Sequence, residues 1–278
     1  MHPSIQALIR SALDEDLDTG DVTSLYFIPE AARSKARIIA KEAGVLSGID
    51  VAVQVFREVD KEMGVRCDKT DGTAFEPGDV ILEIEGSTRS ILSAERTALN
   101  FLQRLSGVAT TTRRYLEAVK PYPVKLLDTR KTTPGWRILE KAAVKDGGGT
   151  NHRMGLYDQV MVKDNHLMAC PKLEDLQAAI DRVRTDRPGI KVQLEAATLE
   201  QLADFLSLHG VDMILLDNMT TDQLRQAVQI NQGRLFLEAS GGITLDTING
   251  VAATGVDAIS VGALTHSSKA VDLSLQVL

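Results

Sequence analysis

The chain has 278 residues, of which 44% are hydrophobic and 25% are charged, and its formal net charge is −7 at pH 7. An acidic chain binds nucleic acid poorly without a specific site, and no apolar run here approaches the roughly 20 residues that span a membrane. The N-terminal sequence turns acidic early, unlike a signal peptide, and the two cysteines, Cys67 and Cys170, lie far apart. These features favour a reducing, cytoplasmic location with no disulfide framework.

The first 115 residues predict a domain that mixes helices with short strands. Apolar residues at helical spacing predict helices over 4–16, 49–59 and 93–119. Short runs broken by Gly, Pro and Asp predict strands within 36–48, 65–86 and 88–93. This mixture is typical of an α+β sandwich domain over residues 1–115. The long third helix would lead into a second domain without a flexible linker.

Residues 116–278 repeat one unit, in which a short apolar run leads into an amphipathic helix. The runs are 124–129, 160–165, 191–196, 213–218, 235–240 and 258–263, and the last four begin 22 or 23 residues apart. Buried strands that alternate with helices predict a parallel sheet. Six units are too few for a full eight-stranded barrel, so we expect an incomplete α/β barrel, with an open doubly wound sheet as the alternative. A return of the last few residues to the N-terminal domain is left open by the pattern.

Several helix ends are also marked. Thr198 and Thr220 are expected N-caps, and Gly210 is an expected C-cap. The spacing of Lys141 and Lys145, four residues apart, is typical of a solvated helix face.

Charge is distributed unevenly. Between residues 120 and 163 there are nine basic and four acidic residues, a local excess of +5 in a chain whose total is −7. Arg130, Lys131, Arg153 and Lys163 lie at breaks in the pattern instead of on a helical stripe, which favours a basin for a small polyanionic ligand.

In an α/β barrel, catalytic residues lie at the carboxyl ends of the strands. Here those ends carry polar or charged residues on consecutive strands, which would converge on one mouth. They are Asp128, Thr129, Arg130, Lys131, Lys163, Asp164, Asn165, Glu195, Asp217, Asn218, Glu238 and Ser240. One such residue can simply end a strand, but the repetition favours a ligand site. Glu195 and Asp217 could hold a hard metal ion or the hydroxyls of a sugar.

Glycine-containing turns follow the last two predicted strands, formed by Ser240, Gly241 and Gly242 and by Val261, Gly262 and Ala263. Glycine lets main-chain N–H groups approach an anion, and a helix beginning at Thr244 would add its positive end. Loops in this position of a barrel often bind phosphate. No dinucleotide-binding or P-loop glycine motif is present.

A second unusual loop, 147–155, has three successive glycines followed by Thr150, Asn151, His152 and Arg153. A lone histidine in a loop is usually a surface residue. Beside Arg153, and near Lys163 in the predicted mouth, His152 is expected to contact a ligand. The ligand should carry a phosphate and at least one further anionic group.

The segment 128–166, "DTRKTTPGWRILEKAAVKDGGGTNHRMGLYDQVMVKDNH", closely resembles the quinolinate phosphoribosyltransferase family, also called nicotinate-nucleotide pyrophosphorylase (carboxylating). So do 95–110, 214–218, 238–243 and 261–267, and the similarity runs from about Leu13 to the C-terminus. The family joins quinolinate to phosphoribosyl pyrophosphate (PRPP), giving nicotinate mononucleotide, pyrophosphate and carbon dioxide in NAD biosynthesis. The resemblance implies a requirement for Mg²⁺, an N-terminal sandwich followed by an incomplete barrel, and a homodimer whose subunits share each site.

The resemblance also implies roles for single residues. Arg96 would reach the partner subunit's site, and Lys131 would face PRPP beside Thr129. Quinolinate would be surrounded by Arg130, His152, Arg153 and Lys163. Glu195 and Asp217 would face the ribose and the Mg²⁺-pyrophosphate, so that Lys131, Lys163, Glu195 and Asp217 are the candidate catalytic residues. The 5′-phosphate would be held by Ser240, Gly241, Gly242, Val261, Gly262 and Ala263.

Three other interpretations remain open from the residues. Lys163 at a strand end could form a Schiff base in a barrel aldolase. A molybdenum-transport-associated family shares the expected fold, but the intact 129–135 and 147–153 segments argue against it. Residues 71–86 resemble a lipoyl or biotinyl carrier hairpin, with Lys69 the nearest lysine. Trp136, where the family usually has a smaller apolar residue, leaves the shape of the site rim open.

Overall fold

The structure is a computed structural model that describes residues 2–169 and 172–278, so Cys170 lies outside the described residues. The chain divides into two compact units, which are described separately. The first comprises Met1–Arg113, Thr133–Gly148 and Ser267–Leu278, and the second comprises Arg114–Thr132 and Gly149–His266. The predicted single domain boundary near residue 115 stays a prediction, because each compact unit is made of several separate segments of the chain.

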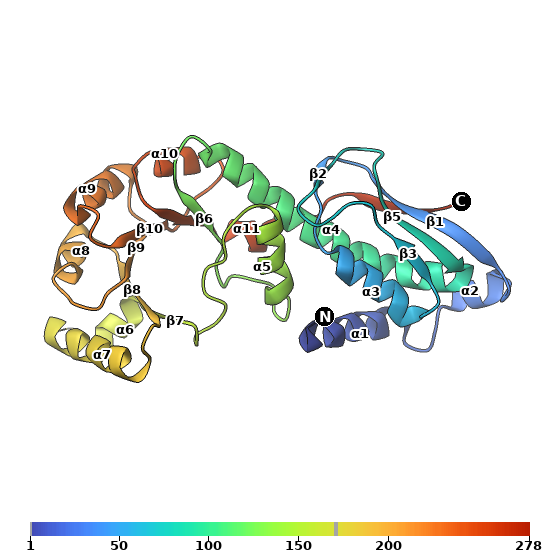
Figure 1. The fold of residues 1–278 in the computed structure, drawn as a ribbon, viewed down its shortest axis with the longest axis horizontal. Helices are drawn as coiled ribbons and strands as arrows, with labels where there is room; N and C mark the ends of the chain where they lie inside the picture. The colour runs from blue at the N-terminus through green and yellow to red at the C-terminus, as the bar shows by residue number, and fades with distance from the viewer. Residues whose placement is uncertain (1, 170–171) are drawn as a thin grey trace. The chain divides into compact units, whose positions relative to one another are not determined.

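The first unit contains a four-stranded sheet in the order β12-β1-β5-β3, with every pairing antiparallel, and a two-stranded antiparallel sheet, β2-β4. Its strands are β1 (Arg33–Ala40), β2 (Gly44–Val45), β3 (Gly64–Arg66), β4 (Ala74–Phe75), β5 (Val80–Ser87) and β12 (Leu273–Val277). Its helices are α1 (Pro3–Leu17), α2 (Val22–Phe27), α3 (Ile49–Val59) and α5 (Arg137–Asp146), together with the part of α4 (Thr88–Val119) that ends at Arg113. The end of the chain therefore adds a strand beside β1 (Figure 1).

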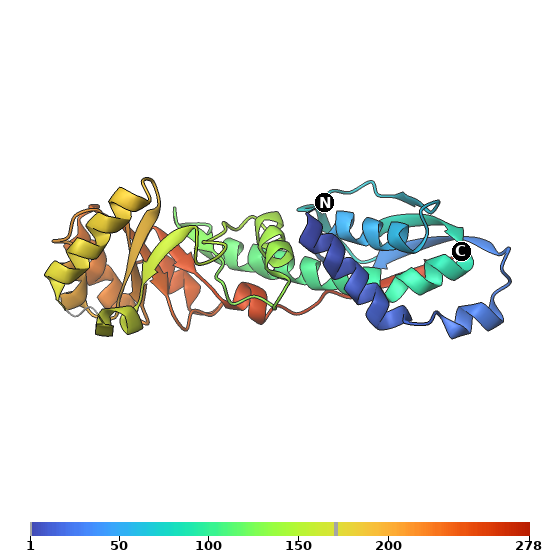
Figure 2. The ribbon, with the colours of Figure 1, turned by 90° about the horizontal axis from the view of Figure 1, so that it is seen from below.

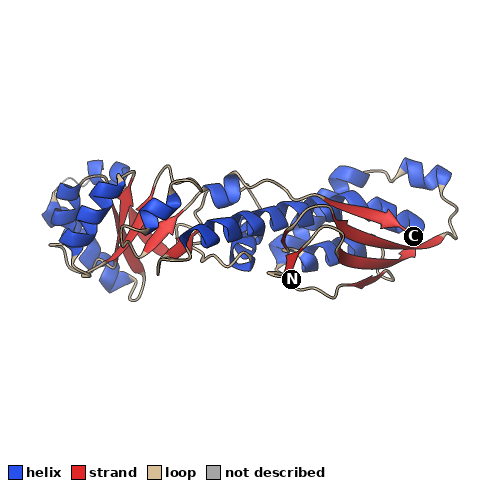
Figure 3. Cartoon of the chain, turned by 90° about the horizontal axis from the view of Figure 1, so that it is seen from above, coloured by secondary structure: helices blue, strands red, loops and turns tan. Residues whose placement is uncertain are grey.

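The large sheet has one buried and one solvated face, because successive side chains of a strand point in opposite directions. Ala36, Ile38 and Ala40 of β1 are at most 1% exposed, whereas Lys35 and Arg37 alternate with them on the other face. The long helix α4 buries apolar residues at helical spacing, among them Ile91, Ala94 and Ala98. Figure 3 separates the helices from the strands of this unit by colour.

Two sequence predictions for this unit are wrong. Residues 88–93 form the first part of α4 and not a strand, since the helical spacing of buried residues continues through Ile91 and Ala94. The solvated face expected for Lys141 holds for Lys145 only, because Lys141 is 1% exposed. The helix α2 was not predicted. It has only six residues, too few for a periodic pattern, and it is capped by the carboxylate of Asp21, which accepts from the Ser24 N–H at 2.9 Å.

The second unit confirms the six predicted strands. They form one parallel sheet in the order β6-β11-β10-β9-β8-β7. Their bounds are β6 (Lys125–Leu127), β7 (Gln159–Val162), β8 (Lys191–Ala196), β9 (Met213–Asp217), β10 (Phe236–Ser240) and β11 (Ala258–Ser260). Neighbours from β7 to β11 follow chain order without a reversal, as in a barrel and unlike a doubly wound sheet. β6 and β7 end the row and do not pair within the described residues, so the barrel is incomplete.

Helices cover the outside of these strands, as Figures 1 and 2 show for α7, α8 and α9. The helices of this unit are α6 (Asp164–Ala169), α7 (Leu173–Asp186), α8 (Leu199–Phe205), α9 (Thr221–Asn231), α10 (Ile248–Ala252) and α11 (Ala263–His266). Both predicted N-caps are confirmed. Thr198 accepts from the Gln201 N–H, and Thr220 forms a reciprocal capping box with Gln223. Among the described residues, no helix has the length and apolar character needed to cross a membrane.

Two predicted helix ends are wrong. Gly210 is not a C-cap, because α8 ends at Phe205, although Gly210 does adopt a positive φ of 75° in the following loop. No helix begins at Thr244. The hydroxyl of Thr247 accepts from the Thr244 N–H at 2.9 Å, which stabilises a turn there, and α10 begins only at Ile248. The positive helix end expected beside the glycine turn is therefore absent from that position.

Candidate active site

A cavity of about 560 Å³ lies at the carboxyl ends of the strands of the second unit. Eleven of the predicted site residues line it: Thr129, Arg130, Lys131, His152, Arg153, Lys163, Glu195, Asp217, Ser240, Gly241 and Gly242. They come from loops or strand ends at β6, β7, β8, β9 and β10. Convergence on a single mouth, which the sequence pattern predicted, is thus present within one unit.

Buried Asp128 organises the loop that carries His152 and Arg153. Its carboxylate is 0% exposed and accepts from the His152 N–H at 2.8 Å and from Asn151 Nδ2 at 2.6 Å. A parallel bridge also joins Leu127 to Thr150. The segment 147–155 therefore runs back along the end of β6. This brings His152, which is 24 positions from Asp128 in the sequence, beside the end of that strand.

Two arginines lie close together in this wall. Arg153 donates to the main-chain oxygen of Gln159 at 3.1 Å and contacts the sulfur of Met161. Burial and the nearby positive charge of Arg130 both lower the pKa of Arg153, with partial compensation from Asp158. Neighbouring like charges raise the free energy of the protein alone, and an anion placed between them would lower it.

On the facing strands, Lys163 Nζ donates to Glu195 Oε2 at 2.5 Å. The Glu195 side chain is 9% exposed, whereas that of Lys163 is 45% exposed. Asp217 is half-buried and accepts from the side-chain amide of Asn218 at 2.8 Å. The two candidate catalytic carboxylates therefore differ, since Glu195 forms an ion pair with a lysine and Asp217 accepts from a neutral amide.

The glycine turn after β10 has the geometry that glycine permits. Gly241 and Gly242 have φ values of +96° and +60°, which disfavour other residues. Asn218 packs against the turn, because its N–H donates to the Ser240 oxygen at 2.9 Å and a Cβ added to Gly241 would clash with its side chain. The turn is therefore shaped by close approach as well as by backbone angle.

The second predicted phosphate turn does not line the cavity. The Val261 N–H donates to the Leu127 oxygen at 3.0 Å as part of the β6–β11 pairing, so it is already used by the sheet. A Cβ on Gly262 would lie 3.0 Å from Lys131 Cδ, which places this glycine behind Lys131 instead of at the cavity wall. Ala263 is the first residue of α11.

Two further predicted positions lie in the first unit. Arg96 is an exposed residue of α4 and is not among the residues that line the cavity. Trp136 stacks on Phe101, with ring centroids 4.7 Å apart and an angle of 18° between the planes. The Trp136 side chain thus packs against a neighbouring aromatic ring, and Trp136 does not line the cavity.

Glu238 and Asn218 were expected at the strand ends, but no binding role was predicted for them or for Ser260, Met161 and Leu215, although all five line the cavity. Glu238 and Asn218 had the same signal as Glu195 and Asp217, a polar residue at a strand end. Met161 and Leu215 are apolar residues inside their strands, and no sequence pattern separates such residues from the ordinary core.

Comparison with known proteins decides the family. The model of the quinolinate phosphoribosyl transferase N-terminal domain matches residues 21–106, and that of the C-terminal domain matches residues 108–276. The chain belongs to the quinolinate phosphoribosyltransferase family. The predicted family and the predicted fold class are thereby confirmed, and the alternatives from other families are not supported.

Relatives and solved structures agree with this family. A probable nicotinate-nucleotide pyrophosphorylase [carboxylating] of Bacillus subtilis (strain 168) is 40% identical over 276 residues, which cover 99% of this chain and 94% of the relative. The chloroplastic relative of Oryza sativa subsp. japonica is 40% identical, with 99% of this chain and 79% of the relative covered. The structure of nicotinate-nucleotide pyrophosphorylase from Francisella tularensis has a TM-score of 0.93 at 38% identity, with coverage of 100% and 98%. NadC from Streptococcus pyogenes has a TM-score of 0.93 at 40% identity, with coverage of 100% and 99%.

Proposed function

We propose that the protein transfers the phosphoribosyl group of PRPP to quinolinate and releases pyrophosphate and carbon dioxide, forming nicotinate mononucleotide for NAD biosynthesis. The observation that carries the proposal is one cavity lined by two neighbouring arginines, two carboxylates and a glycine turn, in a chain of this family. Such a cavity offers separate places for a doubly charged acid, a sugar and a phosphate.

Quinolinate carries two neighbouring carboxylates, and Arg130 and Arg153 suit them. A guanidinium grips a carboxylate through two parallel hydrogen bonds, which a lysine ammonium cannot do. Burial and repulsion from Arg130 lower the pKa of Arg153, and a bound dianion would relieve the repulsion. Each charge-assisted hydrogen bond contributes roughly 1.5–3 kcal/mol to binding.

PRPP would lie across Lys131, the carboxylates and the glycine turn. Breaking the bond between ribose C1 and pyrophosphate develops positive charge on the sugar and negative charge on the leaving group. Glu195 and Asp217 can stabilise the first, and Lys131 can stabilise the second, because fixed charges in a cavity need no reorganisation during the reaction. Gly242, where an added Cβ would have no heavy atom closer than 4.0 Å, leaves the main chain of the turn open to the 5′-phosphate. Decarboxylation then follows at the pyridine 2-position, helped by the new positive charge on the ring nitrogen.

Mg²⁺ fits this cavity only as a partner of the substrate. Within residues 2–169 and 172–278, no group of three or more His, Cys, Asp or Glu side chains could hold a metal ion. Mg²⁺ is commonly held by one or two carboxylates together with substrate phosphates, and Asp217 and Glu195 could supply those carboxylates. When bound, the ion would neutralise charge on the leaving pyrophosphate.

The aldolase alternative requires Lys163 to attack a carbonyl as a free amine. Its Nζ instead donates to the Glu195 carboxylate at 2.5 Å, so it has a carboxylate partner in the cavity. For the carrier alternative, the Lys69 ammonium forms an ion pair with Asp79 at 3.0 Å, and its side chain is only 26% exposed. Neither lysine is presented as those functions need.

A homodimer with shared active sites, in a cytoplasmic location, is part of the proposal. Arg96 is exposed on the first unit, and α2 exposes Val22, Leu25, Tyr26 and Phe27 by 55–81%. Exposed apolar side chains on one short helix suit burial by a partner subunit. Arg96→Ala and Lys163→Ala should each be inactive but regain partial activity when mixed. Absence of recovery in subunits shown to exchange would contradict site sharing.

The deciding experiment is an assay for nicotinate mononucleotide with PRPP, Mg²⁺ and quinolinate, repeated with nicotinate as the acceptor. We expect turnover with quinolinate and stoichiometric release of carbon dioxide. A preference for nicotinate would overturn the assignment of the substrate, since it lacks the second carboxylate that the paired arginines are proposed to bind.

A further inference from the structure

A row of hydrogen-bonded polar side chains runs from Gln159 through Gln193 to Glu238, which lines the cavity. Gln159 Nε2 donates to Gln193 Oε1 at 2.8 Å, and Gln193 Nε2 donates to Glu238 Oε2 at 2.8 Å. His152 Nε2 lies 3.1 Å from the same Glu238 oxygen. Gln193 and Glu238 are both 0% exposed, so the bond between them is protected from water, and the other two bonds are partly buried. The reaction proposed above gives this row no role.

Glu238 is the shared acceptor at the centre of the row. Burial raises the pKa of Glu238, but His152, Ser260 and Gln193 outweigh that effect and bring it below the ordinary value. The group is therefore an ionised carboxylate inside the unit. Its second oxygen, Oε1, is buried and makes no hydrogen bond within the part of the chain that the structure describes.

The hydrogen bonds of His152 define its tautomer. The main-chain N–H of Arg153 donates to His152 Nδ1 at 2.7 Å, so Nδ1 acts as the acceptor. The ring proton must then be on Nε2, which donates it to Glu238. An imidazole that accepts on one side and donates on the other transmits the position of Glu238 to the main chain of Arg153.

The row closes into a ring at Arg153. The guanidinium of Arg153 donates to the main-chain oxygen of Gln159 at 3.1 Å, and the side chain of Gln159 is the first member of the row. Arg153 is thus held twice, through its N–H by His152 and through its guanidinium by Gln159. Every link of the ring lies within the second unit.

We propose that Glu238 is a positioning residue that aims Arg153 at quinolinate, as the common acceptor of a closed hydrogen-bond ring through His152, Gln193 and Gln159. The inference rests on the proposed function, because it assigns Arg153 to quinolinate. Glu238 acts on Arg153 through its hydrogen-bonded neighbours. Gln193 does not line the cavity, but it is part of the same hydrogen-bond ring.

Two other roles for Glu238 give different expectations. A carboxylate that only stabilised the fold would change the unfolding temperature without a selective effect on one substrate. A carboxylate that touched the substrate directly would be insensitive to the distant Gln193 link. If the ring positions Arg153, removing the acceptor at Glu238 or the amide at Gln193 should weaken quinolinate binding. PRPP binding should stay nearly unchanged, since the ring holds Arg153 and not Lys131.

Steady-state kinetics on three variants test this. Glu238→Leu removes the acceptor at similar volume, Glu238→Gln retains an amide oxygen as acceptor, and Gln193→Leu breaks the ring one link away. We expect the KM for quinolinate to rise about tenfold or more in Glu238→Leu and several-fold in Gln193→Leu, as loss of one charge-assisted bond implies. Glu238→Gln should stay within about threefold of wild type, and the KM for PRPP should change less than about twofold in all three.

Imidazole ¹⁵N chemical shifts report the tautomer of His152 and provide a second test that needs no substrate. The His152 signal, identified by its loss in His152→Gln, should report the Nε2–H tautomer in wild type and in Glu238→Gln. Glu238→Leu should lose that preference. If Glu238→Leu does not fold, the kinetics of Gln193→Leu and Glu238→Gln still test whether the ring positions Arg153.

The outcomes separate the two proposals. Wild-type protein that fails to convert quinolinate overturns the proposed function and this inference with it. Wild-type turnover combined with unchanged quinolinate KM in the folded Leu variants overturns the inference alone. Equal damage in Glu238→Gln and Glu238→Leu, or parallel loss of PRPP and quinolinate binding, also overturns it.

Discussion

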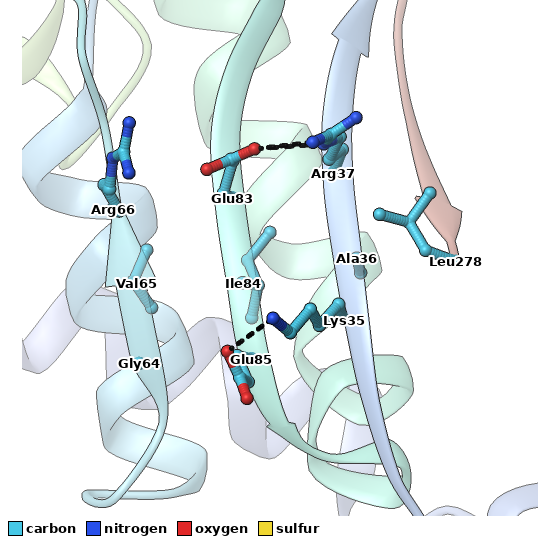
Figure 4. A pocket seen from close by; sticks show the side chains of 10 residues that line it. All are labelled: Lys35, Ala36, Arg37, Gly64, Val65, Arg66, Glu83, Ile84, Glu85 and Leu278. Atoms are coloured by element: carbon cyan, nitrogen blue, oxygen red, sulfur yellow. Dashed lines mark hydrogen bonds and ion pairs between the residues drawn. The ribbon is translucent and has the colours of Figure 1, made fainter.

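Two cavities of similar size, one in each unit, differ in how their charges are arranged. The cavity of about 500 Å³ on the outer face of the first unit's sheet is lined by β1, β3 and β5, with Leu278 at its side (Figure 4). Its charges pair across strands, as Figure 4 shows for Lys35 with Glu85 at 3.5 Å and Arg37 with Glu83 at 2.9 Å. The cavity of about 560 Å³ in the second unit instead places Arg130 near Arg153.

Two arginines summarise the difference. A hydrogen bond from Arg66 to Asp68 raises the pKa of Arg66 on the sheet face, whereas burial and Arg130 lower the pKa of Arg153 in the other cavity. Cavity volume therefore does not identify the active site here. Burial and a nearby like charge make the site of Arg153 suitable for an anionic ligand, whereas Arg66 already has a carboxylate partner in Asp68.

The largest effect is expected for Arg130→Ala. Loss of a bidentate grip on one carboxylate removes two bonds of roughly 1.5–3 kcal/mol each, so quinolinate affinity should fall about 100-fold or more. PRPP affinity should change less than about threefold. Calorimetric titration with each substrate measures both quantities. Arg66→Ala, on the sheet face, is the matched control and should leave both affinities unchanged. Quinolinate affinity that survives in Arg130→Ala would remove the main distinction between the two cavities.

Gly241→Ala is expected to have the next largest effect, and on the other substrate. The φ of +96° and the clash with Asn218 should distort the turn, raising the KM for PRPP about tenfold while quinolinate affinity is retained. Gly233→Ala is a matched control, since Gly233 has a φ of +73° but no atom near the added Cβ. Both variants carry a backbone penalty of about 1 kcal/mol in thermal unfolding, and only Gly241→Ala should lose activity. Equal PRPP kinetics in the two would contradict a phosphate role for the turn.

Sequence reasoning predicted the second unit better than the first for a physical reason. Strands of a parallel sheet are buried on both faces and are separated by amphipathic helices, so apolar runs such as 191–196 and 213–218 stand out clearly. In the first unit the signals are shorter and local. Residues 88–93 read as a strand, and only their burial on α4 shows that the helical spacing already begins there.

For the site, the sequence predicted the residue types at the strand ends but not their links. Arg130, Lys163 and Glu195 were expected because charged residues end apolar runs. The Glu238–Gln193–Gln159 row was not expected, since which inward-facing side chains meet depends on the register between strands that are far apart in the chain. The helix start expected at Thr244 failed because a threonine hydroxyl can stabilise a turn as readily as a helix cap.

A carboxylate that supports the fold should behave differently from those in the cavity. Asp212 Oδ2 accepts from Arg184 at 2.6 Å and from the Val192 N–H at 2.7 Å. Burial raises the pKa of Asp212, but these bonds and Lys191 outweigh it, so its pKa lies below the ordinary value. Asp212→Asn should lower stability at pH 7 by about 1–3 kcal/mol, with little change in kcat.

The pH dependence follows from that direction. A lowered pKa in the folded state means that the stabilisation is present above the unfolded-state pKa of about 3.8 and is lost as the pH falls through the folded-state pKa. Urea unfolding of wild type and Asp212→Asn should therefore converge as the pH falls below about 4. Asp222→Asn, at a side chain that is 83% exposed, is the control and should change stability little at either pH. A gap that persists undiminished in acid would show that the charge of Asp212 is not what stabilises the fold.

The smallest effect is expected for Arg37→Ala, which removes one half of a cross-strand pair on the sheet face. The side chains of Arg37 and Glu83 are 43% and 38% exposed, so water already screens their attraction and stability should change by about 0.5 kcal/mol or less. Quinolinate and PRPP kinetics should both match wild type. Because Arg37 and Arg130 each line a cavity of about the same volume, unequal effects of the two alanine variants would trace function to the arrangement of charge. A loss of quinolinate affinity in Arg37→Ala would instead mean that the sheet face takes part in binding and that the contrast between the cavities is misplaced.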